Sequence, residues 1–110
     1  MTRLDTLLSF LAEDPADAFT RFALAQELAR AGRAEEALEH YSTLQREQPD
    51  YVGTYYHAGK LLEALSRRDD ALAAYRDGIA AATRARDFHA RSELQSALLA
   101  AEGVGDDDFD

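Results

Sequence analysis

The feature that most constrains the fold of this chain is an internal repeat with a period of 34 residues. Residues 18–51 carry a pattern that residues 52–85 repeat almost position by position. Sliding the sequence over itself by that period superposes Leu28 on Leu62, Arg33 on Arg67, Ala37 on Ala71, Leu38 on Leu72 and Tyr41 on Tyr75. Such a period is typical of helical repeat proteins, in which stacked units bury the apolar faces that a single unit leaves exposed.

Small and large side chains recur together in both units. Two helix axes can approach closely where small residues face each other, and an aromatic side chain then fills the space beside them. The aromatic residues are Tyr41 and Tyr75, one in each unit. The small residues are Ala25 and Ala37 in the first unit, and Gly59 and Ala71 in the second.

The full register resembles the tetratricopeptide repeat, a helix–turn–helix unit, in the small two-repeat form of bacterial proteins. The residues that carry the resemblance in the first unit are Leu24, Ala25, Leu28, Gly32, Ala37, Tyr41, Leu44 and Pro49. In the second unit they are Tyr55, Ala58, Gly59, Leu62, Ala71, Tyr75 and Gly78. The second unit departs at two places, with Ser66 where the first has its turn glycine and Thr83 where the first has Pro49.

The resemblance implies an all-α, right-handed stack of about six helices. We expect a helix over residues 2–13 to act as the second half of a truncated unit, because Phe10 takes the place of Leu44. A closing helix is expected over residues 88–102, and residues 103–110 are expected to form a disordered acidic tail. A shift of 36 residues, rather than 34, places apolar side chains of this closing helix on the second unit, so we expect its connection to be about two residues longer. Those side chains are Leu94, Leu98 and Ala101.

The charge balance narrows the classes of partner. The chain has 21 acidic and 12 basic side chains, which gives a net charge of −9. Such a surface repels a phosphate backbone, and nucleic acid is therefore not an expected partner. The same charge would suit a basic partner, or a cytoplasm rich in salt that screens the self-repulsion.

The first apolar segment is expected to be a structural helix and not a targeting or membrane segment. Asp5 interrupts its apolar run, and Pro15 follows where a cleavage site would need small residues. No other stretch reaches the length of a membrane-spanning helix. We therefore expect a cytoplasmic protein without membrane contact.

The sequence contains few candidates for catalytic or metal-binding residues. The chain has no cysteine, and its three histidines fall on three different expected helices. His40 with Glu36 and His89 with Glu93 have a spacing that can share a metal ion, but two ligands do not make a site. The motifs of nucleophilic catalysis and of phosphate loops are absent. We expect no metal, no cofactor and no catalytic residue, and an enzymatic reading would rest on His57 near Tyr56 and Lys60 alone.

The resemblance implies that the first helix of each unit lines a concave groove that holds a peptide or helix of a partner. The expected groove residues are Phe19, Phe22, Gln26 and Arg30 from the first unit, and Tyr56, Lys60 and Glu63 from the second. A terminal helix folded over Phe22 and Tyr56 is the alternative reading of the two rings. Some relatives hold the carboxyl terminus of chaperones with lysines and asparagines, and we do not expect that ligand because Phe22, Gln26 and His57 occupy three of those places.

The sequence thus predicts a non-catalytic protein–protein interaction module that binds a peptide or helix. The alternative is a self-associating structural unit, a homodimer without a separate peptide ligand. Exposed apolar side chains on the terminal helices, such as Phe10 or Leu99, would be a sign of that alternative.

Overall fold

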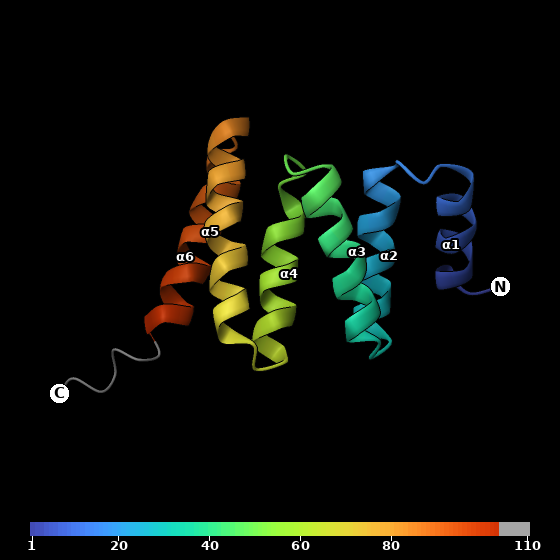
Figure 1. Cartoon of the computed structure of the whole chain (residues 1–110), viewed down its shortest axis with the longest axis horizontal. Helices are drawn as coiled ribbons and strands as arrows, with labels where there is room; N and C mark the ends of the chain where they lie inside the picture. The colour runs from blue at the N-terminus through green and yellow to red at the C-terminus, as the bar shows by residue number, and fades with distance from the viewer. Residues whose placement is uncertain (104–110) are drawn as a thin grey trace.

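The computed structural model describes residues 1–103, which form six α-helices and no strand. The helices follow one another along an elongated stack, with the N-terminus at one end (Figure 1). Their bounds are α1 Arg3–Glu13, α2 Ala18–Arg30, α3 Ala34–Glu47, α4 Gly53–Ala64, α5 Arg68–Ala85 and α6 Phe88–Gly103. Gly103, expected in the tail, is the last residue of α6, and the rest of that expected tail lies outside the described residues.

Helix α1 begins at a reciprocal cap. The side chain of Thr2 accepts a hydrogen bond from the backbone N–H of Asp5, and the Asp5 carboxylate accepts one from the backbone N–H of Thr2. Leu7 and Leu11 of this helix are buried and join the core around α2 and α3. Helix α1 is thus part of the packed stack.

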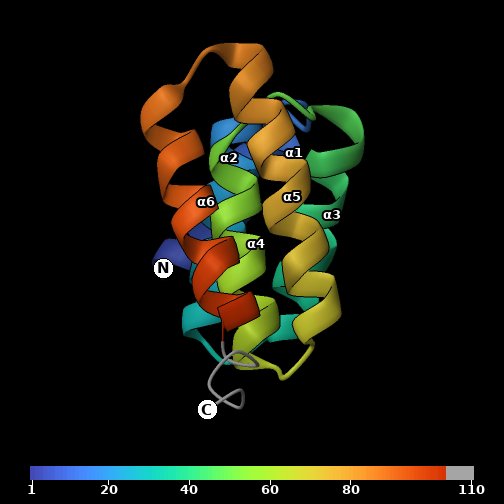
Figure 2. The ribbon, with the colours of Figure 1, turned by 90° about the vertical axis from the view of Figure 1, so that its left-hand side faces the viewer.

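Helices α2 with α3, and α4 with α5, form the two repeated pairs, and α6 packs on α5. Viewed along the stack, α2, α4 and α6 lie on one side and α3 and α5 on the other (Figure 2). We call the side formed by α2, α4 and α6 the inner face, and the side formed by α3 and α5 the outer face.

Close helix contacts occur where the sequence has small residues. Ala25, Ala37 and Ala71 are fully buried. Gly59 of α4 lies so close to the ring of Tyr75 that a methyl group there would overlap it. This contact confirms the expected pairing of a small residue with a large one, and it explains why the second unit has glycine where the first has Ala25.

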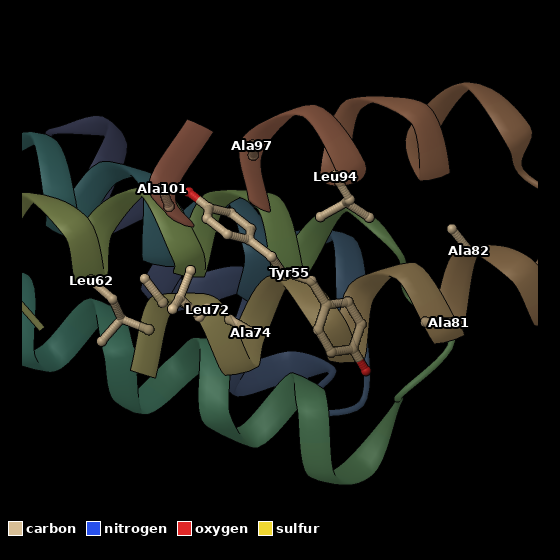
Figure 3. Close-up of a cluster of buried hydrophobic side chains, with 11 residues drawn as sticks. Tyr55, Leu62, Leu72, Ala74, Ala81, Ala82, Leu94, Ala97 and Ala101 are labelled. Atoms are coloured by element: carbon tan, nitrogen blue, oxygen red, sulfur yellow. The ribbon is translucent and has the colours of Figure 1, made fainter. Parts of the chain in front are cut away.

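The core has two connected clusters. One is centred on α2 and α3 and includes Leu24 and Tyr41. The other joins α4, α5 and α6, whose side chains point toward one another in Figure 3. Leu94 and Ala101 of α6 are buried in it, as the shifted register predicted, and Leu98 is partly buried beside them. None of the helices in residues 1–103 combines the length and the apolar character that a membrane span needs.

The expected longer connection before α6 is wrong. The extra residues belong to α5, which has 18 residues where α3 has 14, and only residues 86–87 join it to α6. Pro49 follows the end of α3, and proline disfavours helix in the residue before it. Thr83 takes that place in the second unit and allows another turn, in which its hydroxyl donates to the carbonyl of Ile79. Arg86, in the left-handed conformation, then ends α5.

Candidate functional site

The inner face is hollowed between α4 and α6. Two adjoining hollows of about 400 and 260 Å³ lie there. Tyr56 lines both of them, and Lys60 lines the larger one. The α6 side chains that line them include His89, Ser92, Glu93 and Ser96. A cation, an aromatic ring, two hydroxyls and a carboxylate thus border one surface.

Tyr56 and Lys60 form the α4 wall of this surface. The ammonium group of Lys60 lies 5.9 Å from the centre of the Tyr56 ring, within the range of a cation–π interaction. Lys60 is also 4.0 Å from a carboxylate oxygen of Glu63, and its side chain is 54% exposed. A contact this long at an exposed side chain restrains the lysine only weakly, so its charge is available to a ligand.

Glu63 has a structural contact besides its place near Lys60. Its carboxylate accepts a hydrogen bond from the hydroxyl of Tyr75, whose ring is buried between α4 and α5. Burial raises the pKa of Tyr75, and the hydrogen bond to Glu63 raises it further. Glu63 therefore connects the inner face to the core of the second unit.

Phe22 is a packing residue at the boundary of the two units. Its ring lies 6.1 Å from that of Tyr41, 5.6 Å from that of Tyr51 and 5.2 Å from that of His57. The ring of His57 lies 5.6 Å from Tyr56, so a histidine connects the two rings expected to be neighbours. The ring contacts of Phe22 come from the repeat units themselves. Tyr56, in contrast, packs against the core cluster that includes Leu94 and Ala97 of α6, so the closing helix does flank that ring.

The remaining expected groove residues lie on α2. Phe19 is 66% exposed at the start of the helix. Gln26 is half-buried, and Arg30 is exposed with its guanidinium hydrogen-bonded to the carboxylate of Glu27. That carboxylate also lies 3.3 Å from Arg3 of α1. The two hollows do not extend to these side chains.

Sequence reasoning missed the contribution of α6 to the inner face. It treated the closing helix as a cap. The shift of 36 residues that placed Leu94 also makes Ser92 the repeat equivalent of Tyr56, and Ser96 the equivalent of Lys60. The signal was therefore present in the register. The spacing of His89 and Glu93 also predicts that they are neighbours, and their side chains lie 3.5 Å apart; what the spacing does not show is that both line the hollows beside Tyr56.

The hollows of the inner face offer groups that can bind a ligand: an ammonium group, hydroxyls, a carboxylate and an aromatic ring. Burial lowers the pKa of His57, and the charge of Arg30 lowers it further, which favours a neutral ring at neutral pH. Within residues 1–103, no three histidine, aspartate or glutamate side chains come together as a metal ion would need. His57 and Lys60 are both near Tyr56, and this was the basis of the enzymatic alternative.

Comparison with solved structures decides the family. A tetratricopeptide repeat domain protein from Salinibacter ruber, solved in solution, is 51% identical in sequence; the match covers 82% of this chain and 91% of that one, with a TM-score of 0.79. A crystal structure of a tetratricopeptide repeat domain protein from the same organism is 50% identical over 80% of this chain and 99% of that one, with a TM-score of 0.76. This chain belongs to the tetratricopeptide repeat family.

More distant structures share the tetratricopeptide repeat fold of this chain. PcrH, solved in complex with the chaperone binding region of PopD, has a TM-score of 0.84 at 18% identity, over 93% of this chain and 77% of PcrH. A protein from Bordetella parapertussis has a TM-score of 0.81 at 24% identity, over 99% of this chain and 97% of that one. At these identities the likeness shows the fold alone. No family model and no curated protein matches the sequence.

In this tetratricopeptide repeat chain, α2 and α4 are the first helices of the two units, and α6 stands at the position that the first helix of a further unit would take. The hollows on the inner face therefore lie between two helices of the same repeat position. Since α6 carries polar groups into these hollows, it contributes to the candidate site as well as to the core.

Proposed function

We propose that this chain is a non-catalytic interaction module that binds a peptide or helix of another protein on its inner face. The observation that carries the proposal is the hollow between α4 and α6, which places the exposed ammonium group of Lys60 and the ring of Tyr56 opposite the hydroxyls of Ser92 and Ser96. Rings supply apolar area to an interface, while charged and hydroxyl groups fix the orientation of a ligand.

The chemistry of this surface indicates the kind of segment that fits. Lys60 can pair with a carboxylate or a carbonyl of the ligand, and Glu93 and His89 on the opposite wall can pair with a basic or hydroxyl group. The ligand is thus a segment of mixed polarity with one apolar side chain for the Tyr56 ring. Structural analogy to PcrH, which was solved with a segment of PopD, is consistent with a protein ligand.

The test uses charge reversal on each face. The inner-face variant Lys60→Glu with Ser96→Glu changes the net charge by the same amount as the outer-face variant Arg46→Glu with Ser42→Glu, and all four side chains are exposed. Each protein, first confirmed as folded by circular dichroism, is used to capture partners from a lysate of the source organism. Captured proteins are identified by mass spectrometry.

We expect a partner that wild type and the outer-face variant retain and the inner-face variant loses. Loss of the partner by the outer-face variant alone would move the binding site to α3 and α5. Equal retention by both variants would contradict the proposed site on the inner face. Phe22 is left unchanged, because its contacts with three rings would confound binding with folding.

A second candidate function, self-association, is favoured by the exposure of Phe10. Leu44, at the equivalent repeat position, is 1% exposed, whereas Phe10 is 53% exposed. Leu8 on the same helix is 47% exposed. A second copy that covers this end of the stack would bury both side chains.

Sedimentation velocity at two protein concentrations tests self-association. If the α1 end forms the interface, wild type sediments faster at the higher concentration and Phe10→Asp does not. Leu99→Asp distinguishes the two ends of the stack, because Leu99 is 68% exposed on α6, and loss of association in this variant instead would place the interface at that end. A wild type that stays monomeric at both concentrations would contradict this candidate.

A further inference from the structure

A third hollow, of about 730 Å³, lies on the outer face between α3 and α5. These two helices run side by side in Figure 2 but do not pack directly on each other. Helix α4 lies beneath them and contributes Ala58 and Leu62 to the lining. We call this hollow the outer cleft. It is on the opposite side of the stack from Tyr56 and Lys60.

The floor of the outer cleft is apolar. Leu38 of α3 is partly buried and packs against both core clusters, so it lies at their junction. On α5, Ala74 is buried and Ala73 is exposed. Both alanines line the cleft together with Leu38. An apolar side chain of a partner could therefore be covered here without displacing core residues.

Ion pairs join α3 and α5 at both ends of the cleft. At one end the guanidinium of Arg67 lies 3.7 Å from Glu35 and 3.0 Å from Asp70. At the other end Arg84 lies 2.9 Å from Asp50, which follows α3. These exposed bridges cross between the two helices at the ends of the cleft, and ion pairs of this kind add little to stability.

Two carboxylates facing the cleft are left without an opposite charge. Glu39 of α3 and Asp77 of α5 both line it, and neither forms a salt bridge within residues 1–103. Of the two arginines of the lining, Arg67 is paired with Glu35 and Asp70, whereas Arg46 is exposed and only loosely paired with its neighbour Glu47, at 3.6 Å. The lining holds four carboxylates against these two arginines, so its charge is negative overall, in a chain with a net charge of −9.

We propose that the outer cleft binds a short basic segment of a partner protein. An apolar side chain of that segment lies over Leu38 and Ala73, and arginine or lysine side chains on either side of it pair with Glu39 and Asp77. Apolar floor, open carboxylates and negative net charge all favour such a ligand over an acidic or a purely apolar one. The proposal does not depend on the inner face, since the two surfaces share none of their lining residues.

The probe for this proposal is the acetylated and amidated peptide Arg-Arg-Leu-Arg-Arg, titrated into the ¹⁵N-labelled full chain and followed by NMR. We expect saturable shift changes in the backbone amides of α3 and α5. Two control peptides separate the contributions of charge and apolar contact: one has serine in place of leucine, and the other has glutamate in place of each arginine. The serine peptide should bind more weakly, and the glutamate peptide should not bind.

Two variants of α5 test whether the peptide binds in the outer cleft. Ala73→Arg puts a cation and a long side chain into the cleft, while Ala80→Arg makes the same substitution at another exposed position of the same helix. We expect Ala73→Arg to abolish the shift changes and Ala80→Arg to retain them with an affinity within about twofold of wild type, since only a screened surface charge is added.

Removing the charges of Glu39 and Asp77 tests the proposal independently, through the affinity for the peptide. Glu39→Gln with Asp77→Asn should weaken the peptide roughly fivefold to tenfold, since each exposed ion pair contributes a factor of about two to five. Glu13→Gln with Asp14→Asn removes the same charge from α1 and should leave the affinity close to that of wild type. Equal weakening by both pairs, or shift changes centred on α4 and α6, would overturn the proposal, as would absence of binding at millimolar peptide.

Discussion

At the scale of single residues, the contact between Gly59 and Tyr75 marks a close approach of α4 and α5. The Tyr75 ring is fully buried over the glycine, and its hydroxyl reaches Glu63 at the surface. A side chain at position 59 would have to displace a packed ring, because protein interiors have little free volume. The position therefore tolerates no residue larger than glycine unless the two helices separate.

The first prediction concerns this contact. Gly59→Ala should lower the free energy of unfolding by about 1–3 kcal/mol, the usual cost of overpacking a core. Urea unfolding followed by circular dichroism measures it. The control is Gly53→Ala at the start of α4, where an added Cβ would lie 3.6 Å from the Phe22 ring, an ordinary contact. A Gly59→Ala protein as stable as wild type would show that α5 can move away without cost.

The second prediction concerns the half-buried ring of His57. Burial lowers its pKa in the folded chain, so the unfolded chain binds more protons around the unperturbed value of about 6.5. Stability should therefore fall as pH is lowered from 7.5 to 5.5, a window above the titration of ordinary carboxylates. His57→Phe keeps an aromatic ring between Phe22 and Tyr56 and removes the titrating group.

The free energy of unfolding at the two pH values, measured for both proteins, gives the answer. The difference between the two pH values should be smaller for His57→Phe than for wild type. His40 remains as a second contributor, because burial lowers its pKa too while Arg21 donates to its ring. An identical pH difference in the two proteins would contradict the assignment to His57.

At the scale of helices and turns, the two units use the same turn with different residues. Gly32 ends the turn after α2 with φ of 80°, and Ser66 occupies the equivalent position after α4 with φ of 61°. Glycine adopts this left-handed region at no steric cost, whereas a serine there is strained. The departure of the second unit from the family pattern thus changed the residue and not the backbone.

The third prediction follows from that turn. Ser66→Gly should raise the free energy of unfolding by about 0.5–1 kcal/mol, since the gain from relieved strain exceeds the added entropy of the unfolded chain. Ser42→Gly, at an exposed position inside α3, should instead lower it by a few tenths of a kcal/mol through helix propensity. Urea unfolding of the two variants and wild type is the measurement. A Ser66→Gly protein less stable than wild type would indicate that the left-handed serine is not strained.

At the scale of the whole molecule, charge and shape have separate effects. The elongated stack measures 54 × 31 × 19 Å, so its acidic side chains are spread over a large surface. Ion pairs such as Arg76 with Glu102, at 2.7 Å, join neighbouring helices locally. They do not cancel the excess of acidic groups, and the long-range repulsion acts on the molecule as a whole.

The fourth prediction is that salt stabilises the chain. Raising NaCl from about 0.05 to 1 M shortens the screening length from more than 10 Å to about 3 Å, which removes long-range repulsion. The melting temperature, followed by circular dichroism, should rise by a few degrees. KCl should give the same rise if screening is the cause. A melting temperature that stays flat or falls would mean that weakened salt bridges offset or outweigh the relieved repulsion. That result would contradict a salt-rich cytoplasm as the explanation of the acidic charge.

Much of the fold could be predicted from the sequence because its determinants are local and repeated. The period of 34 residues aligns small residues with large ones, and each pair then meets at a helix contact of the same kind. The family, the all-α stack and the burial of Leu94 and Ala101 all follow from that register. For the candidate site, the register also placed Tyr56 and Lys60 on the face of the first helices.

Only the tertiary structure decided where the surface is hollow and which side chains are already engaged. Three kinds of contact join residues whose distance depends on how the helices tilt. They are the ion pairs of Arg67 with Glu35 and of Arg84 with Asp50, the packing of the His57 ring against Phe22, and the hydrogen bond from Tyr75 to Glu63. The longer α5, in contrast, has a cause in the sequence, because Thr83 stands where the first unit has Pro49. Periodicity assigns each residue to a face of its own helix, whereas a binding surface depends on the separation between helices, and this is set by packing and ion pairs across the whole stack.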